Sequence, residues 1–123
     1  MLDQENSRIV MLYLQEKLKP DSRGRLRGVK TKDVSIEGLD RIEVGNILRE
    51  LHKYNLITVR NPSSVAKRYF IDNITPQGEK FLLAAKDKNL WPKLKKALGP
   101  ISLWTAEKIS QALLAILSNN ILL

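Results

Sequence analysis

The segment 41–54 carries side chains whose types and spacing suit contact with a nucleic-acid groove. Four of them follow one another at i, i+4, i+7 and i+11, intervals that share one face of a helix, namely Ile42, Asn46, Arg49 and Lys53. Asparagine can bond adenine through two atoms, arginine can bond guanine or phosphate, and an apolar side chain can contact a thymine methyl group. Arg41 precedes this set, and Gly45 beside it would let a nucleic-acid backbone approach closely. We predict that these six residues contact DNA; an ordinary solvated helix face is the alternative.

Two basic stretches lie before and after this segment along the chain. The first is a loop between residues 19 and 32, whose arginines are Arg23, Arg25 and Arg27. The second is the tip of a predicted β-hairpin, which carries Arg60, Lys67 and Arg68. Such side chains would contact phosphates, which set affinity and register without reading the base sequence. With a formal net charge of +8, they favour double-stranded DNA as the partner; solvated surface charge is the alternative for each stretch.

A helix over residues 41–54 must position the predicted DNA-contacting side chains. Asp40 can cap its first turn, and Asn55 can adopt the left-handed conformation that ends a helix. At 100° per residue, the opposite face holds the apolar residues that would be buried, which are Val44, Ile47, Leu48 and Leu51. The segment is therefore predicted as an amphipathic helix with one buried and one exposed face.

The N-terminal third of the chain is predicted to hold one helix followed by a loop. The helix begins after a cap at Asp3 or Asn6 and runs to about Lys17, because a proline follows and disfavours helical backbone in the residue before it. Residues 20–35 are predicted as a loop, and a short helix or strand is expected near 34–39.

A β-hairpin and three helices are expected after the predicted DNA-contacting helix. Two β-rich runs, 56–59 and 68–74, are joined by a polar turn sequence and predict an antiparallel pair. Thr75-Pro76 indicates a helix start, because threonine can cap a helix and proline suits its first position. The three helices are predicted over 76–88, over 90–98 with Gly99-Pro100 closing it, and from Ser102 to about residue 118.

The last of these helices forms the C-terminal segment 101–123, which follows a predicted domain over residues 1–100. It is apolar over more than one face, so it must bury against its own domain or against a second copy of the chain. Trp91 and Trp104 flank the corner before it and are expected to pack between the last helices. We favour a homodimer formed through Ile109, Leu113, Ile116 and Leu117.

The order of these elements predicts an α+β fold, mainly α: a winged helix-turn-helix with a β-hairpin wing and two extra C-terminal helices. In a winged helix, the helix before the hairpin enters the major groove, and the hairpin tip contacts the DNA backbone or the minor groove. The predicted function is therefore DNA binding, as a transcriptional regulator. The alternative is a protein-interaction module that has kept this fold but does not bind DNA.

The composition argues against catalysis and against a bound metal or cofactor. The chain has no cysteine, so disulfides and zinc–thiolate sites lack their residues, and a serine–histidine relay would have to rest on its one histidine, His52. No paired carboxylates, glycine-rich phosphate loop or nucleophile–base pair appears, and no small-molecule ligand is indicated. The sequence shows neither a signal peptide nor an apolar run long enough to span a bilayer. We therefore expect a cytoplasmic protein that is not an enzyme and does not bind membranes.

Several motifs between residues 38 and 96 match the pattern of one family. They are Thr-x-x-Gly-x-x-Phe-Leu at 75–82, then Lys86-Asp87, then Trp91-Pro92-Lys93, and upstream Gly38-Leu39-Asp40 and the helix exit Tyr54-Asn55-Leu56-Ile57. In these motifs the chain resembles small winged-helix proteins of bacteria and their prophages, which form a domain of unknown function. Asn55 stands where that family usually has glycine. The resemblance implies a winged-helix fold and a prophage or mobile-element origin, and it brings no known catalytic residue.

Overall fold

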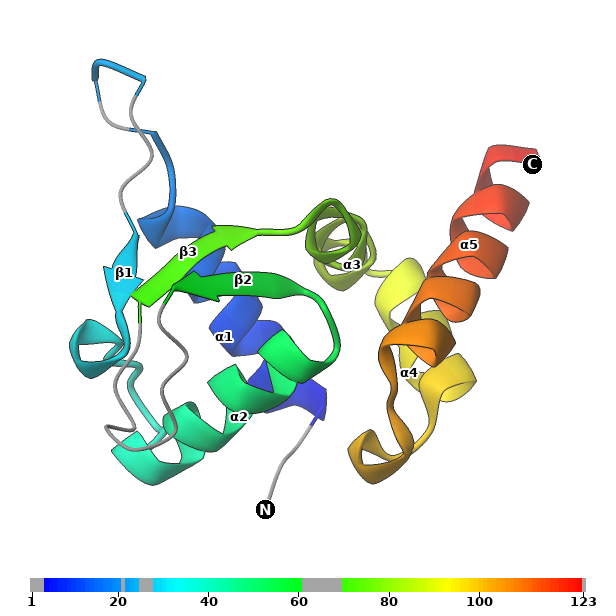
Figure 1. Ribbon diagram of the computed structural model, residues 1–123. Helices are drawn as coiled ribbons and strands as arrows, with labels where there is room; N and C mark the ends of the chain where they lie inside the picture. The colour runs from blue at the N-terminus through cyan, green and yellow to red at the C-terminus, as the bar shows by residue number, and fades with distance from the viewer. Residues whose placement is uncertain (1–3, 21, 25–27, 61–69, 123) are drawn as a thin grey trace.

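A computed structural model describes residues 4–20, 22–24, 28–60 and 70–122, and shows helices packed around a small sheet (Figure 1). One hydrophobic core contains residues from Val10 to Leu113. The elements are, in chain order, α1 (Gln4–Lys17), β1 (Val29–Lys30), the 3₁₀ turn η1 (Thr31–Asp33), α2 (Arg41–Lys53), β2 (Ile57–Arg60), β3 (Phe70–Ile74), α3 (Pro76–Lys86), α4 (Leu90–Leu98), the 3₁₀ turn η2 (Ile101–Leu103) and α5 (Ala106–Leu122).

The described strands form an antiparallel sheet in the order β1-β3-β2. β2 and β3 pair as the predicted hairpin, with Ile57 opposite Ile74 and Arg60 opposite Phe70. The helix α1 contacts α2 and α3, while α4 contacts α3 and α5. The fold is α+β and mainly helical, which confirms the predicted class, and its arrangement is compatible with a winged-helix-like fold.

Two predictions for the N-terminal third were wrong. The predicted loop 20–35 contains the strand β1 and the turn η1, and the segment 34–39 holds neither a helix nor a strand. After η1 the backbone is extended at Val34, and a left-handed Gly38 follows (φ +88°) before α2 begins. A two-residue strand is too short to show a periodic pattern. Its pairing partner, Ile71, also lies far along the chain. Asn6 lies inside α1 and is not its cap, while Asp3 is outside the described residues.

The predicted ends of α2 are confirmed. The Asp40 carboxylate accepts a hydrogen bond of 2.8 Å from the backbone N–H of Glu43, which satisfies a donor that the helix leaves open. Asn55 takes the left-handed conformation (φ 62°) beyond the last turn. The buried face consists of the four predicted apolar residues, Val44, Ile47, Leu48 and Leu51.

The start of α3 forms a close corner with the end of α2. The Thr75 hydroxyl accepts a hydrogen bond of 2.9 Å from the N–H of Gly78 and donates one of 2.7 Å to the carbonyl oxygen of Asn55. A Cβ atom on Gly78 would come within 2.6 Å of the Ile74 side chain and still closer to the carbonyl oxygen of Leu56. The Thr-x-x-Gly spacing therefore has a structural cause: threonine caps the helix, and glycine lets it approach the preceding backbone.

α5 packs on α3 and α4 rather than standing apart from them. Its start also differs from the prediction, because Thr105, not Ser102, accepts the hydrogen bond from the N–H of Lys108 that caps the helix. Ile109 and Leu113 are buried in the core of their own chain. They therefore cannot supply the surface of a dimer in this fold, which corrects that part of the prediction. Ile116 and Leu117 are partly buried against the same core.

The two tryptophans pack between helices, as expected. Both rings contact Phe81, with centroids 5.8 Å away for Trp91 and 6.2 Å for Trp104. The Trp91 indole N–H also donates a hydrogen bond of 2.7 Å to the Glu5 carboxylate, which Lys95 contacts at 2.9 Å. These two hydrogen bonds lower the pKa of Glu5. They join the start of α1 to α4, so the first helix and the C-terminal helices stabilise one another.

Candidate nucleic-acid interface

The structure places four of the predicted DNA-contacting residues of α2, Ile42, Asn46, Arg49 and Lys53, on the side opposite its buried face, and the other two, Arg41 and Gly45, on one flank. Ile42 is 76% exposed, although it is a large apolar residue on a small protein. Arg41, Arg49 and Lys53 are exposed, and Gly45 and Asn46 are partly exposed. Their position follows from the helical period, because at about 100° per residue Ile42, Asn46, Arg49 and Lys53 fall on the far side of the helix from the buried set. Figure 1 shows α2 at the edge of the molecule below the sheet.

Acidic residues of α2 lie on one flank of this exposed face. With 3.6 residues per turn, Glu43 and Glu50 fall roughly 80° from the centre of the face, on the same side. The opposite flank carries Arg41, Gly45 and His52. The arc from Arg41 through Arg49 and Lys53 to Asn46 is therefore free of acidic side chains, which makes it complementary to an anionic surface.

The end of α2 is fixed to the C-terminal part of the molecule. The buried Tyr54 hydroxyl donates a hydrogen bond of 3.1 Å to the carbonyl oxygen of Ile101. Burial, together with the nearby Glu50 carboxylate, raises the pKa of Tyr54, so the phenol stays protonated and keeps its donor. A buried hydrogen bond therefore fixes the C-terminal end of the helix that presents the exposed face.

A hydrogen bond within the exposed face was not foreseen from the sequence. The Arg49 guanidinium donates from Nη2 to the Asn46 side-chain oxygen at 2.7 Å. The i,i+3 spacing of the two residues makes such a contact available on any helix. The spacing of Asn46 and Arg49 is therefore a signal for this contact that the sequence alone contains.

Gly45 has no structural requirement within the described part of the chain. A Cβ atom at this position would have no neighbour within 4 Å, and its backbone is not in the left-handed region. Glycine inside a helix costs roughly 0.5–1 kcal/mol relative to alanine. Packing and backbone conformation therefore do not explain this residue, whereas close approach of a partner to the helix would.

Arg60 is placed differently from the prediction of a free phosphate contact. Its guanidinium forms an ion pair of 2.9 Å with Asp72 and lies 4.8 Å from the centre of the Phe70 ring. Asp72 lies on the paired strand, outside the basic turn sequence, so only the pairing of β2 with β3 brings it within reach of Arg60. The other predicted residues of the hairpin tip, Lys67 and Arg68, lie outside the described residues.

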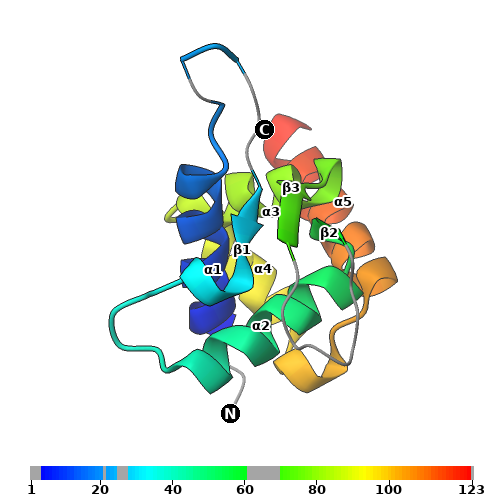
Figure 2. The same ribbon diagram turned by 60° about the vertical axis from the view of Figure 1, so that its left-hand side comes forward.

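The described piece 22–24 of the basic loop lies far from α2. Figures 1 and 2, which are related by rotation about the vertical axis, both show the described piece 22–24 at the top of the molecule and α2 at the bottom. Arg23 is exposed in this piece, while Arg25 and Arg27 lie outside the described residues. This piece therefore does not lie beside the predicted DNA-contacting helix.

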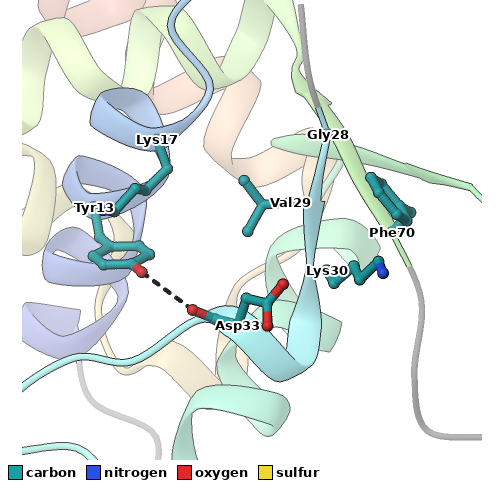
Figure 3. A pocket seen from close by; sticks show the side chains of 7 residues that line it. All are labelled: Tyr13, Lys17, Gly28, Val29, Lys30, Asp33 and Phe70. Carbon is teal, nitrogen blue, oxygen red and sulfur yellow. Dashed lines mark hydrogen bonds between the residues drawn. The ribbon is translucent and has the colours of Figure 1, made fainter.

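An open hollow of about 350 Å³ lies beside the edge strand β1 (Figure 3). Tyr13 closes one side of it, donating a hydrogen bond of 3.4 Å to the carbonyl oxygen of Asp33 and accepting one of 3.4 Å from the N–H of Ser35. These contacts join η1 to α1. The residues that line the hollow are Tyr13, Lys17, Gly28, Val29, Lys30, Asp33 and Phe70.

The fold and this surface define a small, mainly helical α+β protein with an exposed, acid-free face on one helix. The chain belongs to the family described as Hypothetical protein (DUF2513), whose model matches residues 2–102. No curated protein and no solved structure matches the chain. Within the described ranges, no helix is long and apolar enough to cross a membrane, and no group of three or more acidic or histidine side chains is placed to hold a metal ion.

Proposed function

We propose that the protein binds double-stranded DNA by inserting the exposed face of α2 into the major groove. The observation that carries the proposal is the acid-free arc of α2, which combines cationic, amide and apolar side chains opposite a fully buried face. These are the side-chain types that contact phosphates, purine edges and thymine methyl groups. The exposure of Ile42 supports the same role, because an apolar side chain in this position lacks an internal partner.

The described footprint is smaller than the sequence suggested. It comprises α2 and, at the base of the hairpin, Arg60, whose charge is partly compensated by Asp72. We further propose that the protein acts as a transcriptional regulator in the cytoplasm, of prophage or mobile-element type. This extension rests on the winged-helix-like arrangement and on the resemblance in the segment 75–93. A homodimer would present two α2 helices to one face of DNA, about one helical turn apart.

Removal of Arg49 and Lys53, the two cations on the exposed face of α2, tests the proposal. We expect the wild-type protein to bind a labelled duplex at about 50 mM salt, with an affinity that falls steeply toward about 200 mM. The double variant Arg49→Ala/Lys53→Ala is expected to bind at least tenfold more weakly, since it loses one or two direct contacts of roughly 1–3 kcal/mol each. Fluorescence anisotropy over a salt series measures both the affinity and its salt slope.

The matched control removes the same charge from exposed positions of α4. Lys93→Ala/Lys96→Ala lowers the net charge by the same amount as the α2 double variant, from a formal +8. We expect it to change the affinity by less than about threefold, because only the long-range field of the protein changes. Equal losses in the two double variants, or no binding by the wild type at low salt, would contradict the proposal.

Gly45→Ala gives a second test, in which stability and binding are expected to change in opposite directions. The added methyl group meets open space, so the free energy of unfolding should rise by about 0.5–1 kcal/mol. If a DNA backbone approaches the helix at this position, the same methyl group should weaken duplex binding several-fold. Urea denaturation and anisotropy on the same preparation measure the two effects. A variant that is more stable and binds equally well would remove Gly45 from the interface.

A protein-interaction role is the second candidate, and one observation favours it. Three leucines of the C-terminal elements are more than half exposed, namely Leu83, Leu103 and Leu114. Exposed large apolar side chains mark contact surfaces when they gather in a patch. This role predicts that the α2 variants leave binding of the partner protein unchanged, which separates it from DNA binding.

A further inference from the structure

We infer that α2 reads guanine through Arg49, and that Asn46 is a positioning residue for that guanidinium rather than a reader of adenine. The inference rests on the proposed function, since it names the base that the same face would recognise. It reverses the expectation from the sequence, in which asparagine was assigned to adenine. The structural basis is the juxtaposition of the two side chains on the exposed face.

The hydrogen bond between them changes what Asn46 offers to a base. Bidentate contact with adenine needs the amide oxygen to accept from N6 while the amide nitrogen donates to N7. In the structure the Asn46 oxygen accepts a hydrogen bond from Arg49 at 2.7 Å, which uses one of its two lone pairs. The amide nitrogen and the remaining guanidinium N–H groups are all donors. The pair therefore presents mainly donors to a partner.

Guanine is the base whose major-groove edge matches such a surface. It offers two acceptors, N7 and O6, whereas adenine pairs an acceptor with a donor, thymine an acceptor with a methyl group, and cytosine offers a donor. The guanidinium has five N–H donors and uses one of them on Asn46, so a two-pronged contact with guanine remains available. Orientation of the fork by Asn46 lowers the entropy lost when that contact forms.

A comparison with Arg60 shows why a neutral positioning partner matters. Arg60 is held by the carboxylate of Asp72, which compensates its charge. Arg49 is held by an amide, so it keeps its full positive charge toward DNA. None of the ion pairs observed among the described residues involves Arg49. The chain thus contains one arginine that is oriented by a carboxylate, which partly compensates its charge, and another that is oriented by a neutral amide. The second arrangement suits contact with an electronegative groove.

Ile42 extends the predicted recognition along the helix. It lies seven residues before Arg49 on the same face, which corresponds to about 10 Å along a helix axis. That length spans roughly three base-pair steps of 3.4 Å when the helix follows the groove. A thymine methyl group contacted by Ile42 is therefore expected about three base pairs from the guanine.

Selection of binding sites from a random duplex library by the full-length protein tests the inference. We expect the selected sites to share a guanine whose replacement by adenine, or by 7-deazaguanine without its N7 acceptor, weakens binding about tenfold. Arg49→Lys keeps the charge but loses the planar fork, and should reduce this discrimination to less than about threefold. Asn46→Ala should also reduce the discrimination while leaving the salt slope unchanged, because it removes no phosphate contact. Asn89→Ala, an exposed asparagine outside α2, is the control and should change neither quantity.

The possible results separate this inference from the proposed function. A guanine preference that survives Arg49→Lys, or an adenine preference that Asn46→Ala abolishes, would overturn the assignment of the two residues. Binding without any base preference would show that Arg49 contacts phosphate; the inference would then fail while the DNA-binding proposal stands. An absence of duplex binding at low salt would overturn both.

Discussion

Gly78→Ala is expected to lower the free energy of unfolding by about 1–2 kcal/mol. A methyl group at this position would overlap the carbonyl oxygen of Leu56 and press on the side chain of Ile74. Overpacking against fixed atoms typically costs about 1–3 kcal/mol, and a backbone carbonyl cannot rotate away as a side chain can. The higher helix propensity of alanine offsets up to about 1 kcal/mol of this cost. To relieve this overlap in the variant, either α3 must move outward or the backbone corner at Asn55 must open.

Urea denaturation followed by circular dichroism measures the effect, and Gly45→Ala is the matched control. Both variants add one methyl group inside a helix, but only Gly78 has atoms in its way. The two changes in stability should therefore have opposite signs. A Gly78→Ala protein as stable as the wild type would show that the α3 corner does not need glycine, and would remove our explanation of the Thr-x-x-Gly spacing.

Leu113→Ala is expected to lower the free energy of unfolding by about 2–5 kcal/mol, whereas Leu114→Ala should change it by less than about 0.5 kcal/mol. The two residues are neighbours on α5, yet Leu113 is 1% exposed and Leu114 is 67% exposed. Truncation of the first leaves a cavity in the core shared with α3 and α4. Truncation of the second leaves no core cavity, because most of the Leu114 side chain is exposed to solvent in the single chain.

The same pair tests whether a second copy covers the outer side of α5. Denaturation at several protein concentrations detects a dimer, because stability that depends on association rises with concentration. A monomer predicts no such dependence and a large difference between the two variants. A concentration dependence that Leu114→Ala removes would place this leucine in a dimer contact. Equal effects of the two substitutions would contradict the packing of α5 described above.

Local interactions explain which parts of the fold could be predicted from the sequence. The Asp40 cap acts over three residues, Asn55 adopts its left-handed conformation by itself, and Thr75 caps the helix that starts beside it. The two faces of α2 follow from the helical period alone. Such features depend on residues within one turn of each other, so a sequence contains most of the information that specifies them.

Contacts between distant segments explain the errors. β1 exists because Val29 and Lys30 pair with β3, and nothing within those two residues indicates a strand. Arg60 finds its counter-ion on the neighbouring strand, where strand pairing places Asp72 within reach. In both cases the partner is brought close by pairing of segments that are separated in the chain.

The residues of the candidate interface on α2 were determined by the sequence alone, because a 3.6-residue period separates Ile42, Asn46, Arg49 and Lys53 from the buried face. The tertiary structure decided how these side chains are used, through the bond from Arg49 to Asn46. It also decided which charges share the face with them, since the loop piece at 22–24 lies at the other end of the molecule. Helical period is a local property of the chain, whereas side-chain pairing and the distance between surfaces depend on how the whole chain packs.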